Sequence, residues 1–170
     1  HYVAKISDRE IVAQHVKIIP IEVIVRNIAA GTFCKRYGLE NGTKLNHSII
    51  EYCVKDDDLS DPPIAWQAIT ALDPQVEDDL TVMTAMTENV NKYLRAIFYT
   101  LGLVLVDFKL EFGTNSHGDI VLADEICPDT MRLWDINTMQ SFDKDLFRFD
   151  TGDLLAGYKE VQRRLQAWQG

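Results

Sequence analysis

The chain contains 170 residues, of which 46% are hydrophobic and 25% are charged, a composition typical of globular domains. Its formal net charge of -9 argues against nucleic acid as a ligand, because such binding needs a surface rich in Lys and Arg. A small phosphorylated substrate stays compatible with this charge, since a few well-placed cations can hold one.

The three cysteines, Cys34, Cys53 and Cys127, are far apart in the chain. An odd and sparse set is typical of reduced, buried thiols in a cytosolic protein rather than of a disulfide framework.

No apolar run approaches the roughly 20 residues of a membrane span, and the N-terminus lacks a signal-peptide pattern. We therefore expect a cytoplasmic protein without a membrane partner. Because the chain begins at His1 and not at Met, we expect a processed or clipped chain, or part of a longer one.

The first part of the chain predicts a strand, a short helix and a loop. Residues 18–26 are rich in β-branched side chains and predict a strand, which Pro20 restricts to a sheet edge or to the beginning of the ladder. Residues 31–37 predict a short helix that ends at Gly38. The sequence KDDDLSDPP at residues 55–63 predicts an acidic loop.

A long helix is the clearest element of the sequence. Asp73 suits the N-cap position, and Pro74 suits the first helical position. Apolar residues then recur at helical spacing as far as Leu101, and Gly102 ends the pattern. We expect one amphipathic helix between these signals.

A hairpin is predicted after this helix. Residues 103–112 read as a strand, residues 113–118 as a turn, and residues 119–126 as the partner strand. Apolar spacing across residues 154–168 predicts a final amphipathic helix. Together these elements indicate an α+β fold with antiparallel pairing around the hairpin.

The first hairpin strand is the most informative segment for function. Side chains alternate across a strand, so one face carries only apolar residues, from Val106 to Phe112. The opposite face carries Asp107, Lys109 and Glu111. This face either lines a cleft or is a solvated surface whose charges pair with one another.

The partner strand strengthens the interpretation as a site. It ends in Asp124 and Glu125, which the hairpin can bring near the acidic face between Asp107 and Glu111. Crowded carboxylates repel, and Mg²⁺ relieves that repulsion by taking one or two carboxylates together with nucleotide phosphate and water. Lys109 could then contact a phosphoryl oxygen. By spacing alone, this pattern fits several ATP-using folds.

Two further segments offer cations for a phosphate. The predicted strand ends on Arg26, and small residues lead from it to Thr32 at the start of a helix, which suits a phosphate cradle. Alternatively, Thr32 caps the helix and Arg26 lies on the surface. Arg132 could add another phosphate contact with Trp134 anchoring its loop, or the two could be a packed surface aromatic and its neighbour.

These segments together resemble the SAICAR synthetase (phosphoribosylaminoimidazole-succinocarboxamide synthase) family. The resemblance covers nearly the whole chain and rests on several blocks in the right order. The blocks are IPIEVIVRNIAAGTFCKR at residues 19–36, the K-x-D-x-x-x-D-P loop at residues 55–62, LVLVDFKLEFG at residues 103–113 and VLADEICPDTMRLWD at residues 121–135.

The resemblance implies an α+β fold with antiparallel sheets, flanking helices and an ATP cleft between two domains. Residues 1–24 would be the remaining part of an N-terminal nucleotide-binding domain, and residues 25–170 a C-terminal domain that binds substrate and magnesium. It also implies a ligase of purine biosynthesis. Carboxyaminoimidazole ribonucleotide (CAIR), L-aspartate and ATP would give the succinocarboxamide SAICAR, ADP and phosphate through an acyl phosphate, with Mg²⁺ as cofactor. A homodimer is the oligomeric state that we favour.

The same resemblance assigns roles to individual residues. The ribonucleotide phosphate would be held by Arg26, Thr32 and Arg132. The catalytic residues would be Lys109, near the substrate and the phosphoryl group, and Asp107 on the same polar face. The magnesium ligands would be Glu111 and Asp124. The adenine would lie beside Ile18, Ile19 and Pro20, largely through backbone, with Glu22 further along that strand. The side where substrate and aspartate meet would be lined by Lys55, Asp57 and Asp61.

The sequence departs from the family pattern in two places. Thr32 stands where the family often has Ser, which keeps the hydroxyl and adds a methyl group. The family also opens with a glycine-rich strand and loop whose lysines cover the ATP phosphates, and no such segment precedes His1. Either the chain is a fragment, or another polypeptide supplies this part, and we expect the chain alone to be inactive without it. The alternatives are a non-catalytic nucleotide-binding module and a different ATP phosphotransferase or carboxylate–amine ligase.

Overall fold

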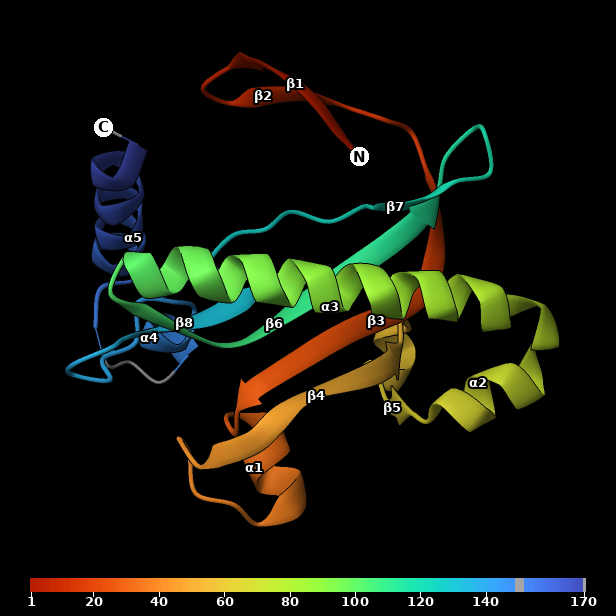
Figure 1. Cartoon of the computed structure of the whole chain (residues 1–170), viewed down its shortest axis with the longest axis horizontal. Coiled ribbons are helices and arrows are strands. Elements are labelled where there is room, and N and C mark those ends of the chain that lie inside the picture. Colours follow the sequence, from red (N-terminus) through yellow and green to blue (C-terminus); the bar gives the residue numbers. More distant parts are fainter. Residues whose placement is uncertain (149–151, 170) are drawn as a thin grey trace. The chain divides into compact units, whose positions relative to one another are not determined.

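The structure, a computed structural model, describes residues 1–148 and 152–169 (Figure 1). The chain forms two compact units, each assembled from three separate stretches of sequence. Unit 1 consists of His1–Ile24, Glu51–Thr87 and Leu110–Glu125. Unit 2 consists of Val25–Ile50, Glu88–Lys109 and Ile126–Gly170.

The strands form two antiparallel systems. A separate hairpin in unit 1, visible in Figure 1, pairs β1 (Tyr2–Ser7) with β2 (Glu10–Ala13). The larger sheet has the order β5-β4-β3-β6-β7, and β8 also pairs with β6. Its strands are β3 (Lys17–Ile28), β4 (Lys44–Val54), β5 (Pro63–Ile64), β6 (Leu103–Thr114), β7 (Ile120–Leu122) and β8 (Met131–Asp135).

The helices differ widely in length. They are α1 (Thr32–Tyr37), α2 (Trp66–Leu72), α3 (Glu77–Thr100), α4 (Asp145–Arg148) and α5 (Leu154–Gln169), with 3-10 turns η1 (Asp57–Leu59) and η2 (Pro74–Val76). Within the described part of the chain, none of the helices has the length and apolar character that a membrane span requires.

The mixture of helices with antiparallel sheets confirms the α+β fold class.

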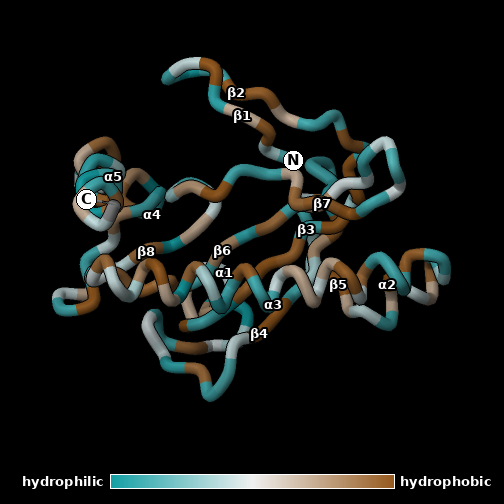
Figure 2. Tube along the Cα trace, turned by 45° about the horizontal axis from the view of Figure 1, so that its top comes forward, coloured by the Kyte–Doolittle hydropathy of each residue, from teal (hydrophilic) through white to brown (hydrophobic). Residues whose placement is uncertain are grey.

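Each unit has apolar side chains that are removed from water. In unit 1, Leu80 and Met83 of α3 and Phe112 of β6 are each 0% exposed. In unit 2, Trp134 packs with Ala30 and Val106, so it is a buried aromatic rather than a surface one. From Val106 to Phe112 of β6, apolar and polar residues alternate (Figure 2). Burial of such apolar area is the main favourable term in folding.

Most of the predicted elements are confirmed, with shifted boundaries. The long helix begins with the 3-10 turn η2, in which Asp73 caps by accepting a hydrogen bond from the Gln75 amide at 3.0 Å. Helix α1 ends at Gly38, whose φ of 64° is left-handed. Pro20 lies near the start of β3, which has strands on both sides. The prediction that Pro20 lies on an edge strand is therefore wrong, and the alternative, that it lies at the beginning of a ladder, is confirmed.

The hairpin partner is shorter than predicted. Strand β7 covers only three residues, because the chain leaves the ladder after Leu122. Asp124 instead accepts a hydrogen bond from the Glu125 amide, at 2.9 Å. The acidic loop at residues 55–63 is also more ordered than expected, since it contains η1.

Arg164 anchors α5 in unit 2. Its guanidinium donates to the carbonyl oxygens of Leu101 (3.2 Å) and Gly102 (3.0 Å), which end α3. It also pairs with Asp135 at 2.8 Å and with Glu160 at 2.7 Å. The Arg164 hydrogen bond and the Thr138 and Asn137 amides lower the pKa of Asp135 to about 2.

We predict that this anchor makes stability depend on acid pH. The pKa of Asp135 is 3.8 ordinarily and about 2 in the folded protein. The stability that the ionised Asp135 contributes is therefore complete at a pH above its pKa in the unfolded chain, and it is lost as the pH falls through its pKa in the folded protein. Asp135→Asn should lower the urea midpoint of unfolding at neutral pH. The difference in midpoint between this variant and wild type should narrow as the pH falls from the unfolded to the folded pKa of Asp135. Asp8→Asn changes a side chain that is 94% exposed. It is the control, and its urea midpoint should differ little from wild type at every pH. A gap for Asp135→Asn that does not depend on pH would contradict the pairing.

Candidate functional site

Three strands of unit 2 bring together two arginines and one carboxylate. Asp107 of β6 lies opposite Arg132 of β8 in the ladder. The Oδ2 atom of Asp107 accepts hydrogen bonds from Arg26 Nη1 at 2.9 Å and from Arg132 Nη1 at 2.8 Å. Asp107 is only 3% exposed and Arg26 only 4%. A solvated strand face is therefore the wrong interpretation for Asp107, and a surface position is wrong for Arg26.

A second carboxylate fixes the orientation of Arg132. Asp145, at the start of α4, accepts from Arg132 Nε at 2.6 Å and from Nη2 at 3.4 Å. Burial favours a lower pKa for Arg132, but Asp107 and Asp145 outweigh it, so the pKa is raised. Arg132 thus stays charged while it is buried, with carboxylates on two sides.

Gly31 allows the chain to pass close to Arg132. Its φ is 57°, and a Cβ atom at this position would lie 2.5 Å from Arg132 Nη2. The glycine therefore serves both the backbone conformation and the space that the guanidinium needs. Helix α1 follows directly, with Gly31 as its N-cap and no side-chain cap. The alternative in which Thr32 caps this helix is wrong, and the Thr32 side chain is exposed.

An open cavity of about 320 Å³ lies beside this cluster. Its lining includes Gly31, Cys34, Lys35 and Asp145. Burial raises the pKa of the Cys34 thiol, which the neighbouring Arg132 and Arg26 oppose only in part. The thiol is therefore neutral at physiological pH. None of the three cysteines forms a disulfide, as predicted, but Cys127 is only half-buried.

Sequence reasoning missed the charged segment that completes the cluster. Lys144 donates to the carbonyl oxygen of Asp129 at 2.6 Å, and Arg148 Nη1 lies 3.9 Å from Asp145 Oδ1. Burial lowers the pKa of Lys144, and Arg148 and Arg132 lower it further. The charges in DKDLFR at residues 143–148 were the available signal. Arg26, Arg132 and Arg148 each pair with Asp107 or Asp145, whereas Lys144 donates its hydrogen bond to a backbone carbonyl.

Unit 1 holds a different charged cluster. Lys55, directly after β4, places its Nζ atom 2.9 Å from Glu111 Oε1 and 3.8 Å from Glu22 Oε1. Both glutamates are buried, at 8% and 7% exposure. The solvated-face interpretation is therefore wrong for Glu111 too. Burying carboxylates is costly unless they are paired, and here a half-exposed ammonium supplies the opposite charge.

The loop after Lys55 is folded by its own aspartates. Asp61 Oδ1 accepts from the Asp56 amide at 3.0 Å, and Asp56 caps η1 by accepting from the amides of Asp58 and Leu59. The predicted residues Lys55, Asp57 and Asp61 therefore lie on one compact loop of unit 1. Their roles toward substrate stay predictions.

The hairpin brings the backbone at the two predicted magnesium ligands close together. The Ala123 amide donates to the Glu111 carbonyl at 2.9 Å, so Asp124 follows the residue that faces Glu111. Within residues 1–148 and 152–169, no group of three or more His, Cys, Asp or Glu side chains could hold a metal ion. Glu111 and Asp124 thus form a pair at most, and the metal site stays a prediction.

The remaining predicted residues lie on β3 and β6. Ile18 and Pro20 are exposed and Ile19 is buried, in the part of β3 that belongs to unit 1. Lys109 of β6 is half-buried, and its amide donates to the Thr130 carbonyl at 2.8 Å. Their contacts with nucleotide or substrate stay predictions.

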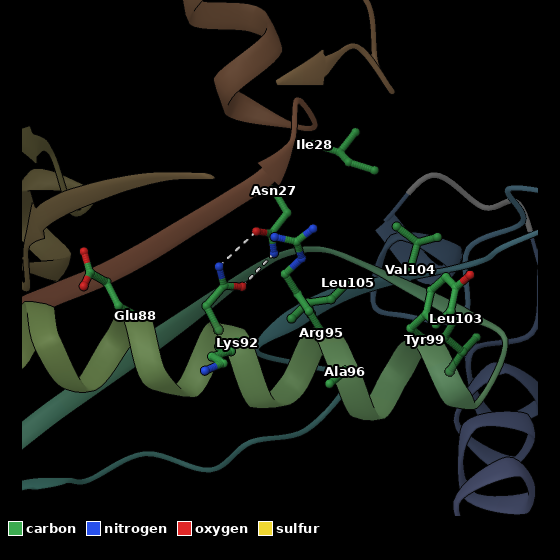
Figure 3. Close-up of a pocket in the computed structure, with 11 residues that line it drawn as sticks. Asn27, Ile28, Glu88, Lys92, Arg95, Ala96, Tyr99, Leu103, Val104 and Leu105 are labelled. Atoms are coloured by element: carbon green, nitrogen blue, oxygen red, sulfur yellow. Dashed lines mark hydrogen bonds between the residues drawn. The ribbon is translucent and has the colours of Figure 1, made fainter. Parts of the chain in front are cut away.

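Another cavity in unit 2 contains none of the predicted site residues. It is open, measures about 530 Å³ and is lined by α3 and by parts of β3 and β6 (Figure 3). Asn27 and Asn91 form part of its polar lining, and both are hydrogen-bonded to each other and to Ser48 at 2.6 to 3.3 Å. Lys92 and Arg95 at its rim are exposed. A neutral network whose members bind one another points to structure rather than to chemistry.

Comparison with known proteins identifies the family. The family model described as SAICAR synthetase matches residues 1–165. The phosphoribosylaminoimidazole-succinocarboxamide synthase of Thermoanaerobacter sp. (strain X514) is 50% identical over 165 residues, which are 97% of this chain and 70% of that protein. The synthase of Anoxybacillus flavithermus is 48% identical, over 97% of this chain and 69% of that protein.

Solved structures agree with these matches. A SAICAR synthetase in complex with ADP has a TM-score of 0.93 and 40% identity, covering 98% of this chain and 71% of that one. The synthase of Ehrlichia chaffeensis has the same score and identity, covering 98% and 72%. The fold and these matches place the chain among ATP-dependent ligases of purine biosynthesis. Within that class, it belongs to the SAICAR synthetase family.

We predict that Gly31→Ala displaces Arg132 and weakens binding of the ribonucleotide. A Cβ atom at Gly31 meets the guanidinium at 2.5 Å, so we expect the dissociation constant for CAIR, measured by calorimetry, to rise about tenfold. Gly38→Ala is the control for a substitution at positive φ without a steric contact, because Gly38 has a φ of 64° but no atom within 4 Å of the added Cβ. Gly31→Ala should lose more stability than Gly38→Ala, because Gly31 has a ψ of -129°, outside the left-handed helical region that Gly38 occupies. Equal CAIR affinity in the two variants would contradict this role.

Proposed function

We propose that the protein joins L-aspartate to CAIR at the expense of ATP, giving SAICAR, ADP and phosphate. Family membership and 50% identity to a phosphoribosylaminoimidazole-succinocarboxamide synthase support this reaction. A relative of known structure binds ADP, which supports a nucleotide substrate. The observation that carries the proposal is the buried carboxylate of Asp107 between Arg26 and Arg132.

The chemistry requires activation of a carboxylate. A carboxylate is a poor electrophile, because its charge is delocalised over two oxygens and neither is a good leaving group. One CAIR carboxylate oxygen therefore attacks the γ-phosphorus of ATP, the bond to the β-phosphate oxygen breaks, and ADP leaves. The aspartate amine then attacks the carbonyl carbon of the acyl phosphate. The C–O bond to phosphate breaks, phosphate leaves, and the nitrogen loses a proton as the amide forms.

The unit 2 cluster would bind the CAIR phosphate. Arg26 and Arg132 offer planar arrays of N–H donors that match phosphate oxygens. Asp107 and Asp145 hold these guanidiniums in place before substrate arrives, so less ordering is left for binding. Lys144 and Arg148 add charge at the same cluster, and the exposed Thr32 hydroxyl would donate or accept a further hydrogen bond.

The unit 1 carboxylates would serve the nucleotide. Glu111 already lies 2.9 Å from an ammonium group, so its surroundings accommodate a cation, and carboxylate oxygens are the ligands that Mg²⁺ prefers. Glu111 and Asp124 would hold Mg²⁺, which supplies neutralisation of phosphate charge when bound. Lys109 would contact the transferring phosphoryl group.

Other assignments complete the proposal. The adenine would lie against Ile18, Ile19 and Pro20, largely through backbone groups, with Glu22 further along β3. The loop with Lys55, Asp57 and Asp61 would line the side where substrate and aspartate meet. A cytoplasmic location and a homodimer, expected from the sequence, belong to the same proposal.

We predict that the full-length protein releases ADP from MgATP and CAIR only when L-aspartate is present. A coupled ADP assay with and without aspartate measures this dependence, and mass spectrometry of the product identifies SAICAR. The amide-forming step requires an amine, so omission of aspartate should abolish turnover. Release of ADP at the same rate without aspartate, or with a different carboxylate substrate, would contradict the proposed function.

We also predict that Glu111→Gln lowers kcat/KM by about 100-fold or more and raises the Mg²⁺ concentration for half-maximal activity. The amide keeps the size of the side chain but loses the charge that a divalent cation requires. Glu160→Gln in α5 is the control, because it also removes an ion-paired carboxylate and should leave the Mg²⁺ dependence unchanged. An unaltered Mg²⁺ dependence in Glu111→Gln would exclude this residue as a ligand.

A further inference from the structure

The segment after β8 turns back and runs antiparallel to it. The Asp135 amide donates to the Gln140 carbonyl at 2.8 Å, and the Phe142 amide donates to the Leu133 carbonyl at 2.9 Å. Trp134 forms an isolated bridge with Ser141 between these two bonds. Residues 140–143 therefore lie beside β8, and the chain then enters α4 with Lys144 and Asp145.

Asp143 is the residue at which this segment changes direction. Its side chain is 0% exposed. One oxygen, Oδ2, accepts a hydrogen bond from the Leu133 amide of β8 at 2.8 Å. The other, Oδ1, accepts from the Asp145 amide at 2.9 Å. A single buried carboxylate thus joins β8 to the first turn of α4.

The two amides that Asp143 binds are next to charged residues of the phosphate cluster. Leu133 directly follows Arg132, and Asp145 is itself the partner of Arg132, at 2.6 Å. Lys144 lies between the two acidic residues and donates to the Asp129 carbonyl at 2.6 Å. The position of Lys144 and Asp145 relative to Arg132 therefore depends on both hydrogen bonds of Asp143.

We propose that Asp143 is a positioning residue for phosphate binding: without touching the substrate, it holds Lys144 and Asp145 in register with Arg132. The inference rests on the proposed function, in which Arg132 and Lys144 bind the ribonucleotide phosphate. A carboxylate suits the task because both of its oxygens accept hydrogen bonds and neither donates when ionised. An apolar residue of similar size would fill the space but leave two buried amides without acceptors.

Asp143→Asn tests this role with little change in side-chain size. The amide group keeps one acceptor oxygen, so one of the two backbone amides faces an NH₂ group instead. Calorimetry on the full-length protein should show CAIR affinity reduced about tenfold or more, with ADP affinity within about twofold of wild type. Ribose 5-phosphate, a probe that carries only the sugar phosphate, should lose affinity by a similar factor.

Val161→Ala is the matched control for a general loss of stability. Val161 is a buried residue of α5 in the same unit, 3% exposed, and it makes none of the hydrogen bonds above. We expect this variant to melt at a lower temperature but to bind CAIR as wild type does. If Asp143→Asn also melts lower and keeps wild-type affinity for CAIR and ribose 5-phosphate, Asp143 serves stability alone and the inference is overturned.

A second variant keeps the test usable if Asp143→Asn does not fold. Asp143→Ser retains one hydroxyl that can accept from either amide, and we expect a smaller but measurable loss of CAIR affinity. Unchanged affinity in folded Asp143→Ser would overturn the inference. Failure of the proposed function is a separate result: the wild-type protein itself would then bind neither CAIR nor ribose 5-phosphate.

Discussion

The carboxylate of Asp107 receives one hydrogen bond from each of two buried arginines, and the arrangement of unit 2 depends on this contact. Removing three charged groups from water is costly, and it is tolerated only when the charges are paired with good geometry. Arg26, Asp107 and Arg132 come from β3, β6 and β8, so the pairing also fixes how these strands meet. Truncating one member would leave an uncompensated buried charge, which typically costs about 3–5 kcal/mol.

Other features of unit 2 maintain the same arrangement. Gly31 leaves the space that the Arg132 guanidinium fills, Asp145 orients its other edge, and Asp143 ties the segment carrying Asp145 to β8. An arginine held on several sides loses little freedom when a phosphate binds. Part of the ordering that substrate binding would require has thus been achieved by folding. This is how a chain with a net charge of -9 concentrates cations at one place.

The sequence predicted local structure well and long-range partners poorly. Alternation along residues 106–112 correctly placed Asp107 and Glu111 opposite an apolar face, and cap signals located α3. Alternation does not say whether a polar face is covered, so solvated and buried interpretations both stayed open until tertiary contacts decided between them. The partner of Asp107 at position 26 lies 81 residues away, and no short-range pattern encodes such a contact. Asp145 was missed because its role exists only once the chain has folded back along β8. The division at residue 24, and the roles of Lys109 and Asp124, stay predictions.

The dissociation constant for CAIR in Asp107→Asn, measured by calorimetry beside that for ADP, tests the central claim most directly. Asparagine keeps the shape of the side chain but not the charge that holds both guanidiniums. If their placement governs phosphate binding, CAIR affinity should fall at least about tenfold, while ADP affinity stays within about twofold of wild type. Equal or tighter CAIR binding would contradict the account, because it would mean that the sum of positive charge, and not the fixed position of Arg26 and Arg132, determines affinity.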